Sequence, residues 1–482
     1  MSDPAISTTA NTDWAALKPY KLLIFALFIA EITGSFESAM IIAVMKYLIE
    51  DFGDPALVGW LVTAYLIVGA AAAALVGRMG DIFGRRRVLL IVLAIGVAGS
   101  LVSAFAPSFG WLLTGRIMQG MTGAILALCI GLVRENLPAQ HVPMGIGLMI
   151  SGASLGTAAG LILGGWIADN YSWHGVFIAS VGFCATAWGA VRLWVPRSPL
   201  GVNTAGIDWF SGILFAPGIM LVLYYVGSIA KLGLFDNTGL VAFAAGMALL
   251  SYWLWRSLTA KVPLLDVRQF RNRNVLVANI VTALVALSSL QITLIFAILL
   301  QSPVWTGIGL GVSSFVSGLA KLPSNLLSTF AGPLSGWITG RGGGRMAMLL
   351  GGALAATGWI MVYFLHESVE VVIAILCVIS FGTTILFAVG PTILAEAVTP
   401  ERTSEVSGML TVVRGLFQGI GAMIVTTLLA SQVVTDPASK AQYPNEAAFQ
   451  LTIAVVIGFS ILATLCAFAL PRGRAMATGV AP

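Results

Sequence analysis

The sequence predicts an all-α polytopic membrane protein, and three observations lead to that prediction. First, 58% of the 482 residues are hydrophobic and only 9% are charged, whereas a soluble domain averages about 45–50% apolar and about 25% charged residues. Second, apolar runs long enough to span a bilayer, about 20 residues each, recur along the whole chain. Third, Lys and Arg are concentrated in alternate loops. These features argue against a soluble enzyme, a disordered protein and a nucleic-acid binder.

Fourteen segments are predicted to be transmembrane helices, because each is an apolar run bounded by charged residues or by clusters of Pro and Gly. At about 20 residues a span, the hydrophobic residues of the chain suffice for about fourteen crossings. The predicted segments are 22–49, 57–77, 88–107, 109–132, 145–168, 173–195, 209–228, 238–257, 274–301, 311–338, 346–365, 371–395, 408–430 and 450–470.

The distribution of basic residues predicts the orientation in the membrane. With the N-terminus placed inside, the inner tails, loops and helix ends hold 19 of the 25 Lys and Arg residues, and the outer side holds three. The remaining three, Arg116, Lys321 and Arg414, lie within predicted spans. Basic residues are retained on the cytoplasmic side of membrane proteins. Both termini are therefore predicted to be cytoplasmic, with the chain in the cell inner (plasma) membrane.

An internal repeat divides the chain. Residues 77–86 read GRMGDIFGRR and residues 336–345 read GWITGRGGGR, so both fit G-x-x-x-[D/G]-x-x-G-x-R at an offset of 259 residues. Without segment 206–262 the offset is 202, the length of a six-helix bundle. The predicted organisation is a six-helix bundle in 1–205, two inserted transmembrane helices in 206–262 and a second six-helix bundle in 263–482. Parallel halves of this kind are typical of a large class of transporters.

Residues 77–87 resemble the loop 2–3 motif of the major facilitator superfamily. Further stretches resemble motifs of its fourteen-helix drug:proton antiporter branch, namely 37–46, 60–65, 116–120, 172–174 and 414–419. The resemblance implies a major facilitator fold with 14 transmembrane helices, arranged as two six-helix bundles plus two inserted helices. It also implies a secondary transporter that exports hydrophobic or cationic amphipathic compounds in exchange for protons, by alternating access.

The predicted fifth span departs from that branch at one position. The motif G-x3-G-P-x2-G-G, associated with antiport, is matched by Gly156, Gly160, Gly164 and Gly165, but Leu161 stands at the position of the Pro. This departure and the three basic residues within spans leave a second cargo open. The alternative is a proton-coupled carrier of organic anions or amphipathic lipids.

The chain lacks the signatures of an enzyme, since it contains no HExxH sequence and no nucleophile elbow. It has no Gly-Lys dipeptide and therefore no GxxxxGK[ST] phosphate-binding loop, so an ion gradient is expected to drive uphill transport. The four Cys residues stand singly in apolar runs, which argues against disulfides and a metal site. No cofactor is expected. The expected partners are protons, an amphipathic small molecule and membrane lipid, and the chain is expected to be a monomer.

Two carboxylates in span one, Glu31 and Glu37, are candidates for proton binding. A charge at mid-bilayer costs about 2.5–3.5 kcal/mol on insertion scales, so such residues face the bundle interior. Burial favours the protonated form, which lets a carboxylate load and release a proton. Six residues place the two side chains about 120° apart around the helix. Glu37 matches the family motif and is preferred, and the alternative is a structural ion pair.

Arg116 and Gln119 are predicted to share one face of span four with Gly120 and Gly123, at i, i+3, i+4 and i+7. Arg116 is expected to point inward, where it holds Glu37 in its charged form until a proton or substrate competes. The alternative is a fixed structural counter-ion. In the second half, Lys321 and Arg414 are the cavity candidates. Lys321 is expected to bind an anionic substrate group or to neutralise Glu31 or Glu37, unless its side chain snorkels.

Two regions are predicted to act in gating. In loop 2–3, Asp81 and Arg85 have the chemistry of a latch, in which a carboxylate and a guanidinium pair in one state and separate in another. The resemblance implies that Asp81 docks on the start of span thirteen, and the second copy of the motif has Gly340 in its place. The glycine ribbon of span five permits close helix packing, and the resemblance implies a flexing seam between the halves. The full set of gating candidates is Gly77, Asp81, Gly84, Arg85, Arg86, Gly156, Gly160, Gly164 and Gly165.

The linker 263–273 has apolar residues at helical spacing between arginines. This pattern predicts a short interfacial helix on the inner leaflet that attracts anionic lipid.

Overall fold

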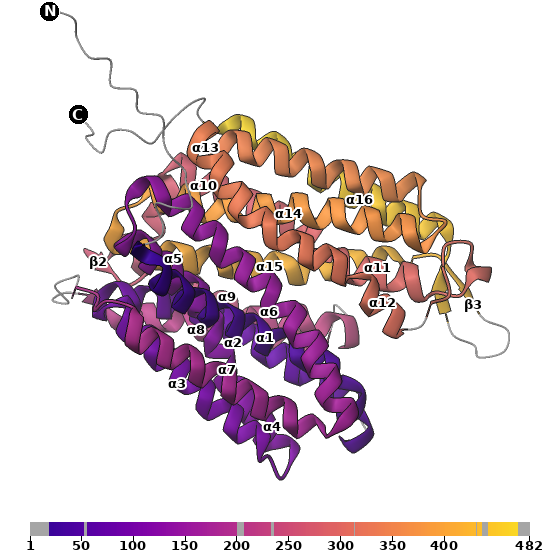
Figure 1. Cartoon of the computed structure of the whole chain (residues 1–482), viewed down its shortest axis with the longest axis horizontal. Coiled ribbons are helices and arrows are strands. Elements are labelled where there is room, and N and C mark those ends of the chain that lie inside the picture. The colour runs from indigo at the N-terminus through magenta and orange to yellow at the C-terminus, as the bar shows by residue number, and fades with distance from the viewer. Residues whose placement is uncertain are drawn as a thin grey trace, which may run out of the picture.

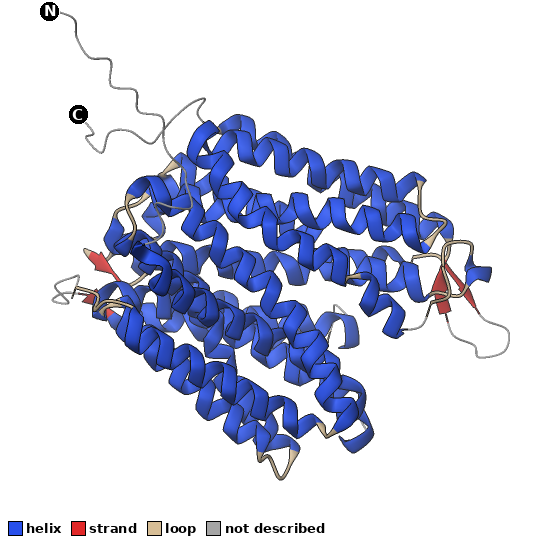
Figure 2. Cartoon of the chain, viewed as in Figure 1, coloured by secondary structure: helices blue, strands red, loops and turns tan. Residues whose placement is uncertain are grey.

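The computed structural model describes residues 19–52, 55–199, 207–232, 236–312, 314–429, 431–435 and 442–470. Twelve helices among these residues are long and apolar enough to cross a membrane. The strands of the described chain form two short pairs, β1 (Ile207–Asp208) with β2 (Val262–Pro263) and β3 (Val433–Thr435) with β4 (Gln442–Pro444). The prediction of an all-helical membrane protein is confirmed (Figure 2). The predicted cytoplasmic tails and the division at 205/206 lie outside the described residues.

The first half of the chain forms the N-terminal group of helices, drawn in indigo to purple in Figure 1. Two short helices, joined by the 3-10 turn η2 (Met121–Ala124), together cover predicted span four. The helices are α1 (Lys21–Phe52), α2 (Pro55–Phe83), α3 (Arg85–Ala104), α4 (Phe109–Gly120), α5 (Ile125–Asn136), α6 (Val142–Asn170) and α7 (Trp173–Trp194).

The remaining helices follow in the second half, drawn in magenta to yellow in Figure 1. Short 3-10 turns precede several of them, among them η4 (Val267–Arg271) and η7 (Pro400–Arg402). The helices are α8 (Trp209–Leu232), α9 (Asn237–Thr259), α10 (Arg273–Leu287), α11 (Ile292–Gln301), α12 (Ser314–Ala320), α13 (Leu322–Phe364), α14 (Val369–Ala397), α15 (Thr403–Leu429) and α16 (Glu446–Leu465).

The long helix α13, with 43 residues, covers the second part of predicted segment 311–338, whose first part includes α12, and nearly all of segment 346–365. Its backbone leaves helical geometry at Gly343, where φ is 80° and ψ is 163°. A positive φ of this kind is readily adopted only by glycine. The chain therefore changes direction inside the second copy of the loop motif, between predicted segments 311–338 and 346–365.

The two halves meet along two seams, one between α6 and α13 and one between α2 and α15. In the first seam, Ser151 donates a hydrogen bond to the carbonyl oxygen of Thr329 at 2.5 Å, and Gly147 lies against the backbone of Gly332. In the second seam, a side chain at Gly408 would collide with the backbone of Ala73. In Figure 1 the helix groups approach each other at the end that carries α5, α10 and β2 and diverge toward the end that carries α4 and β3. Close backbone contact thus joins the halves in the described structure.

Helices α8 and α9 pack on each other, and α8 also packs on α2 and α15. One apolar cluster unites Phe215 of α8, Trp253 of α9 and Met409 of α15 with Leu265 of the following linker. Leu264 and Leu265 are buried in protein, and the linker contains only the five-residue turn η4. The structure thus replaces the predicted interfacial helix with a turn, because these two leucines face the seam between the halves and not lipid.

Candidate functional site

Glu37 lies inside the N-terminal group of helices, and its side chain is fully buried. Five side chains donate hydrogen bonds to its carboxylate, from α3, α4, η2 and α7. The donors are Ser100 Oγ at 3.1 Å, Gln119 Nε2 at 3.2 Å, Ser180 Oγ at 2.9 Å and Cys184 Sγ at 3.2 Å to Oε1, and Thr122 Oγ1 at 2.8 Å to Oε2.

This set of donors can serve both protonation states of Glu37. Hydroxyl groups donate and accept hydrogen bonds, whereas a protonated carboxyl group needs an acceptor. The hydroxyl oxygens of Ser100 and Ser180 lie 2.9 Å apart, and either can be the donor. A proton added to Glu37 therefore meets hydroxyl oxygens that can accept it after their own hydrogens rotate. The arrangement can hold the charge or the proton without leaving the carboxyl group unpaired.

Arg116 is buried beside Glu37 but does not pair with its carboxylate. Its Nη1 donates to the backbone carbonyl of Glu37 at 3.1 Å and to Oε1 of Gln119 at 2.9 Å, and its Nε donates to the carbonyl of Leu61 at 3.3 Å. Its guanidinium also lies 4.4 Å from the ring centroid of Tyr65. Within the described part of the chain, no ion pair joins Arg116 to Glu37. Arg116 thus acts on the carboxylate through the amide of Gln119, which it orients.

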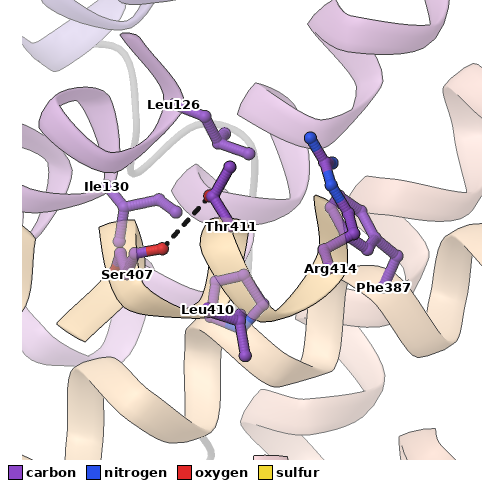
Figure 3. Close-up of a pocket in the computed structure, with 8 residues that line it drawn as sticks. Leu126, Ile130, Phe387, Ser407, Leu410, Thr411 and Arg414 are labelled. Atoms are coloured by element: carbon purple, nitrogen blue, oxygen red, sulfur yellow. Dashed lines mark hydrogen bonds between the residues drawn. The ribbon is translucent and has the colours of Figure 1, made fainter. Parts of the chain in front are cut away.

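Glu31 and Arg414 form a second pair of candidates, which spans the two halves. Glu31 on α1 is buried, at 6% exposure. Arg414 on α15 lies within electrostatic range of it, and its guanidinium lies 4.9 Å from the ring centroid of Phe387. Arg414 also lines a pocket between α5, α14 and α15, shown in Figure 3. The lining residues are Leu126, Ile130, Phe387, Pro391, Ser407, Leu410, Thr411 and Arg414.

Lys321 lies apart from both clusters. It occupies the break between α12 and α13, where Pro323 falls in the first turn of α13. Its ammonium group has no hydrogen bond or ion pair within the described ranges, and it does not line the pocket of Figure 3. The structure therefore brings together Glu37, Arg116 and Gln119, places Glu31 with Arg414, and leaves Lys321 in neither group.

Asp81 at the end of α2 contacts the other half of the molecule. Its carboxylate accepts hydrogen bonds from the backbone amides of Ser404 at 3.3 Å and Glu405 at 2.8 Å, in the first turn of α15. The first amides of a helix have no partner within the helix and carry partial positive charge. Asp81 also binds Arg85 through a hydrogen bond of 2.8 Å. The carboxylate thus supplies the missing acceptor for α15.

Arg85 extends this contact, whereas Arg86 does not. Arg85 donates to Ser404 Oγ at 2.9 Å, to the carbonyl of Pro400 and to Glu135 at 3.2 Å. Arg86 instead donates to the carbonyl of Arg192 at 2.6 Å, within its own half. The two arginines therefore differ in what they hold together.

Two motif glycines are explained by the backbone. A side chain at Gly77 would collide with the backbone of Ser404, so glycine there permits the close approach of α2 to α15. Gly84 has φ of 92°, which favours glycine, and lies against Ser198.

The glycine ribbon of α6 packs within its own half. Gly156 lies against the backbone of Ile32 and Gly160 against that of Phe36, both on α1. Gly164 also faces α1, and Gly165 has no atom within 4 Å of the position its Cβ would take. The predicted seam between the halves is therefore misplaced, because on α6 the glycine that meets the other half is Gly147.

Sequence reasoning missed the hydroxyl donors around Glu37 and one acidic network. Glu405 is fully buried, and its carboxylate lies 3.5 Å from both Arg78 and Arg402. It also accepts a hydrogen bond of 2.7 Å from the backbone amide of Asp266 in the linker. The sequence gives little indication of this network, because Glu405 stands between polar residues near the start of a helix, a pattern that predicts an exposed side chain.

Comparison with known proteins places the fold. Residues 27–422 match the Major Facilitator Superfamily. This match covers well over half of the chain, so the chain belongs to the major facilitator superfamily, as the loop 2–3 resemblance predicted. The superfamily consists of membrane transporters that are generally not enzymes.

Relatives and a solved structure agree with this assignment. The chain is 23% identical over 470 residues to the "Uncharacterized MFS-type transporter YcnB" of Bacillus subtilis, covering 93% of this chain and 96% of the relative. It is 25% identical over 377 residues to the "Multidrug resistance protein Stp" of Mycobacterium tuberculosis, covering 77% and 68%. The human organic anion transporter MFSD10 (TETRAN) has a similar fold, with a TM-score of 0.66, 14% identity and coverage of 93% of this chain and 99% of that chain.

Proposed function

We propose that this chain is a proton-coupled exporter of hydrophobic, amphipathic compounds that works by alternating access. The observation that carries the proposal is the buried carboxylate of Glu37, held by five side-chain donors inside an apolar helix bundle. An ionisable group at this depth is a candidate for ion or substrate movement by default. The multidrug-resistance name of the Mycobacterium relative supports export of amphipathic compounds.

We assign the chain to the fourteen-helix branch, with both termini on the cytoplasmic side of the plasma membrane. Twelve helices qualify as spans, α13 contains two segments on either side of Gly343, and the 24 residues of α8 supply another. The count is then fourteen. The proposed units are the bundles 1–205 and 263–482, with α8 and α9 in the insertion between them.

In the proposed mechanism, Glu37 is the proton site and Arg116 positions its surroundings through Gln119. Gain of a proton removes the negative charge that the amide of Gln119 and the surrounding hydroxyls stabilise. The helices that contribute these donors are α3, α4 and α7, so a change at Glu37 alters contacts between four helices. The latch formed by Asp81 and Arg85 holds α2 on α15 in one state, and the opposite state requires these contacts to break.

The charge of the cargo has two candidates. The first is a cationic amphipathic compound, which competes with the proton for the acidic residues. The second is an organic anion or amphipathic lipid, carried with a proton. Arg414, which lines the pocket between the halves, and Lys321, whose ammonium group has no described partner, favour the second. These residues attract a negative group on the substrate.

Reconstitution into proteoliposomes with an imposed pH gradient tests the proposal. Two probes are followed, the lipophilic cation tetraphenylphosphonium and the aromatic anion naphthalene-2-sulfonate. Glu37→Gln is expected to abolish gradient-driven movement of whichever probe is transported, because the amide cannot carry the proton. Glu367→Gln, in the exposed turn after α13, is the matched control and is expected to behave as the native chain. Intact gradient-driven transport in Glu37→Gln would show that Glu37 is not the coupling site.

A further inference from the structure

The pocket between α5, α14 and α15 has the chemistry of an anion-binding subsite. We propose that Arg414 binds the negatively charged group of an amphipathic substrate in this pocket, and that Glu31 is the internal group that competes with the substrate for Arg414. This inference rests on the second candidate of the proposed function, a carrier that takes an anion together with a proton, and names the substrate class, an aromatic or aliphatic anion such as a sulfonate or carboxylate.

The guanidinium of Arg414 has donors without a described partner. A guanidinium carries five N–H donors and cannot be deprotonated in a protein. Arg116 donates through Nε and Nη1 to Leu61, Glu37 and Gln119, although its Nη2 has no described partner, whereas Arg414 has no hydrogen bond or ion pair with any described residue. Its contacts are the ring of Phe387 at 4.9 Å and the longer-range attraction of Glu31. A half-buried cation with unused donors beside a pocket is suited to a ligand that supplies acceptors.

The pocket lies along a polar face of α15 that includes Arg414. Ser407, Thr411 and Arg414 lie at i, i+4 and i+7 of α15 and thus share one face, as Figure 3 shows. The hydroxyl oxygen of Ser407 is buried and has no hydrogen-bond partner among the described residues. Such an unpaired group costs about 1–3 kcal/mol when it stays unsatisfied. A ligand acceptor or donor in the pocket would remove that cost.

The other walls of the pocket, formed by α5 and α14, are apolar. Leu126 and Ile130 of α5 face the polar stripe and Phe387 of α14 lies beside Arg414 in Figure 3. Pro391 of α14 also lines the pocket. The cavity in the pocket has a volume of about 10 Å³, room for about one water molecule. In the described state it therefore admits only a single small polar group, and the ring or chain of a ligand needs α5 to move away from α14 and α15. The two halves both contribute, since α5 belongs to one and α14 and α15 to the other.

The protonation of Glu31 changes how much of the charge of Arg414 is available to a substrate. The charged and titratable groups that interact with Arg414 are Glu31 of α1 and Tyr65 of α2, while α5 and α14 present apolar side chains to the pocket. Cys129 of α5 interacts in turn with Glu31. An ionised Glu31 offsets the charge of Arg414, and a protonated Glu31 leaves that charge for the substrate. An anion and a proton thus favour each other's binding, whereas a cation and a proton compete.

Equilibrium binding to the full chain in lipid nanodiscs tests this inference. The probes are naphthalene-2-sulfonate and its matched cation, 2-naphthyltrimethylammonium, followed by their fluorescence. Arg414→Gln is expected to weaken sulfonate binding by about 10- to 100-fold, as expected for hydrogen bonds to a charged group, and to leave the cation unaffected or bound more tightly. Arg341→Gln is the matched control, because Arg341 stacks on Trp337 away from the pocket. This variant is expected to bind both probes as the native chain does.

Two further variants keep the test decisive if Arg414→Gln does not fold. Arg414→Lys keeps the charge without the guanidinium fork and is expected to retain part of the sulfonate affinity. Glu31→Gln is expected to flatten the pH dependence of sulfonate binding and to keep at high pH the affinity that the native chain has at low pH. Sulfonate affinity unchanged by Arg414→Gln, or weakened by Glu31→Gln, would overturn the proposal.

Gradient-driven transport separates this inference from the proposed function. If the native chain moves the cation under a pH gradient but does not bind the sulfonate, the anion subsite is wrong and proton-coupled export stands. If the sulfonate binds through Arg414 but no probe responds to the gradient, the subsite stands and proton coupling is wrong.

Discussion

The two halves of the molecule place similar residues in opposite situations. Arg116 in the N-terminal group donates to three partners in its own half and is fully buried. Arg414 in the C-terminal group is also followed by a Gln-Gly pair, at 418–419, yet no hydrogen bond joins it to Gln418 in the described structure and it faces a pocket. The two copies of the loop motif differ in the same way, since the first copy makes contacts and the second copy is open. Asp81 binds across to α15, whereas no atom lies within 4 Å of where a side chain would begin at Gly340.

The difference shows that an intramembrane charge is best judged by the partners its side chain has. Arg116 donates through Nε and Nη1 to three groups of its own half, although its buried Nη2 has no described partner, and it holds those groups in place. A guanidinium with unused donors beside a hollow is available to a ligand. The N-terminal half therefore presents a closed polar network and the C-terminal half presents an open one.

The largest expected effect is on folding stability, when Arg116 and Arg414 are each replaced by alanine. Arg116→Ala removes the hydrogen bonds to the carbonyl groups of Leu61 and Glu37 and to the side-chain amide of Gln119, and because hydrogen bonds from a charged donor are worth about 1.5–3 kcal/mol each, the expected cost is more than about 3 kcal/mol of folding free energy. Arg414→Ala loses no described hydrogen bond and only the contact with the ring of Phe387, worth about 0.5–1 kcal/mol. Thermal unfolding of the purified variants in detergent measures both. Equal loss of stability in the two variants would contradict the contrast between the halves.

The second effect concerns the two copies of the loop motif. Asp81→Asn keeps the shape of the side chain but loses the charge that binds Arg85 and the amides of Ser404 and Glu405. Charge-assisted hydrogen bonds are worth about 1.5–3 kcal/mol, so the amides at the start of α15 are expected to exchange hydrogen about 10- to 100-fold faster. Hydrogen exchange followed by mass spectrometry of the peptide around 400–410 measures this.

Gly340→Asp is the matched change in the second copy of the motif. Because the position is open, the new carboxylate is expected to leave exchange at the start of α15 unaltered. Slower exchange there would mean that the second loop also reaches the first turn of α15, and the asymmetry would fail.

Much of the fold could be predicted from the sequence, because apolar length and glycine breaks are local properties. Each predicted span falls within or across described helices, and even the turn at Gly343 lies between two predicted segments. The superfamily followed from the loop motif, where Asp81 and Arg85 stand at fixed spacing. Local patterns suffice when one segment carries the whole signal.

The partners of the candidate residues could not be predicted in the same way. Ser100, Thr122 and Ser180 lie in three different segments, and small hydroxyl residues are common in any membrane helix. Only the folded chain brings them to Glu37. The leucines of the linker show the reverse error, since helical spacing of apolar residues indicates burial but not whether lipid or protein covers them.

A smaller effect is expected from the hydroxyl cage around Glu37. Ser180→Ala removes one of several donors to the carboxylate, and a neutral hydrogen bond contributes about 0.5–1.5 kcal/mol. Gradient-driven transport is therefore expected to fall by about two- to tenfold without being abolished. Ser460→Ala is the matched control in the C-terminal half, because that hydroxyl is buried and has no partner in the part of the chain that the structure describes. A comparable loss in both variants would mean that the cage has no special role.

The smallest effect is expected at the linker. Asp266→Ala removes the pair between its carboxylate and Arg402, which are 3.2 Å apart, with the Arg402 side chain 22% exposed. Partly exposed pairs contribute about 0.2–1 kcal/mol, and the backbone amide of residue 266 still donates to Glu405 in the variant. Exchange at the start of α15 is thus expected to rise by less than about fivefold. Asp236→Ala, at the N-terminus of α9 far along the chain, is the control. If Asp266→Ala raised exchange as much as Asp81→Asn does, the linker would hold the halves together as firmly as loop 2–3 does. The contact at the start of α15 would then depend on both the linker and loop 2–3.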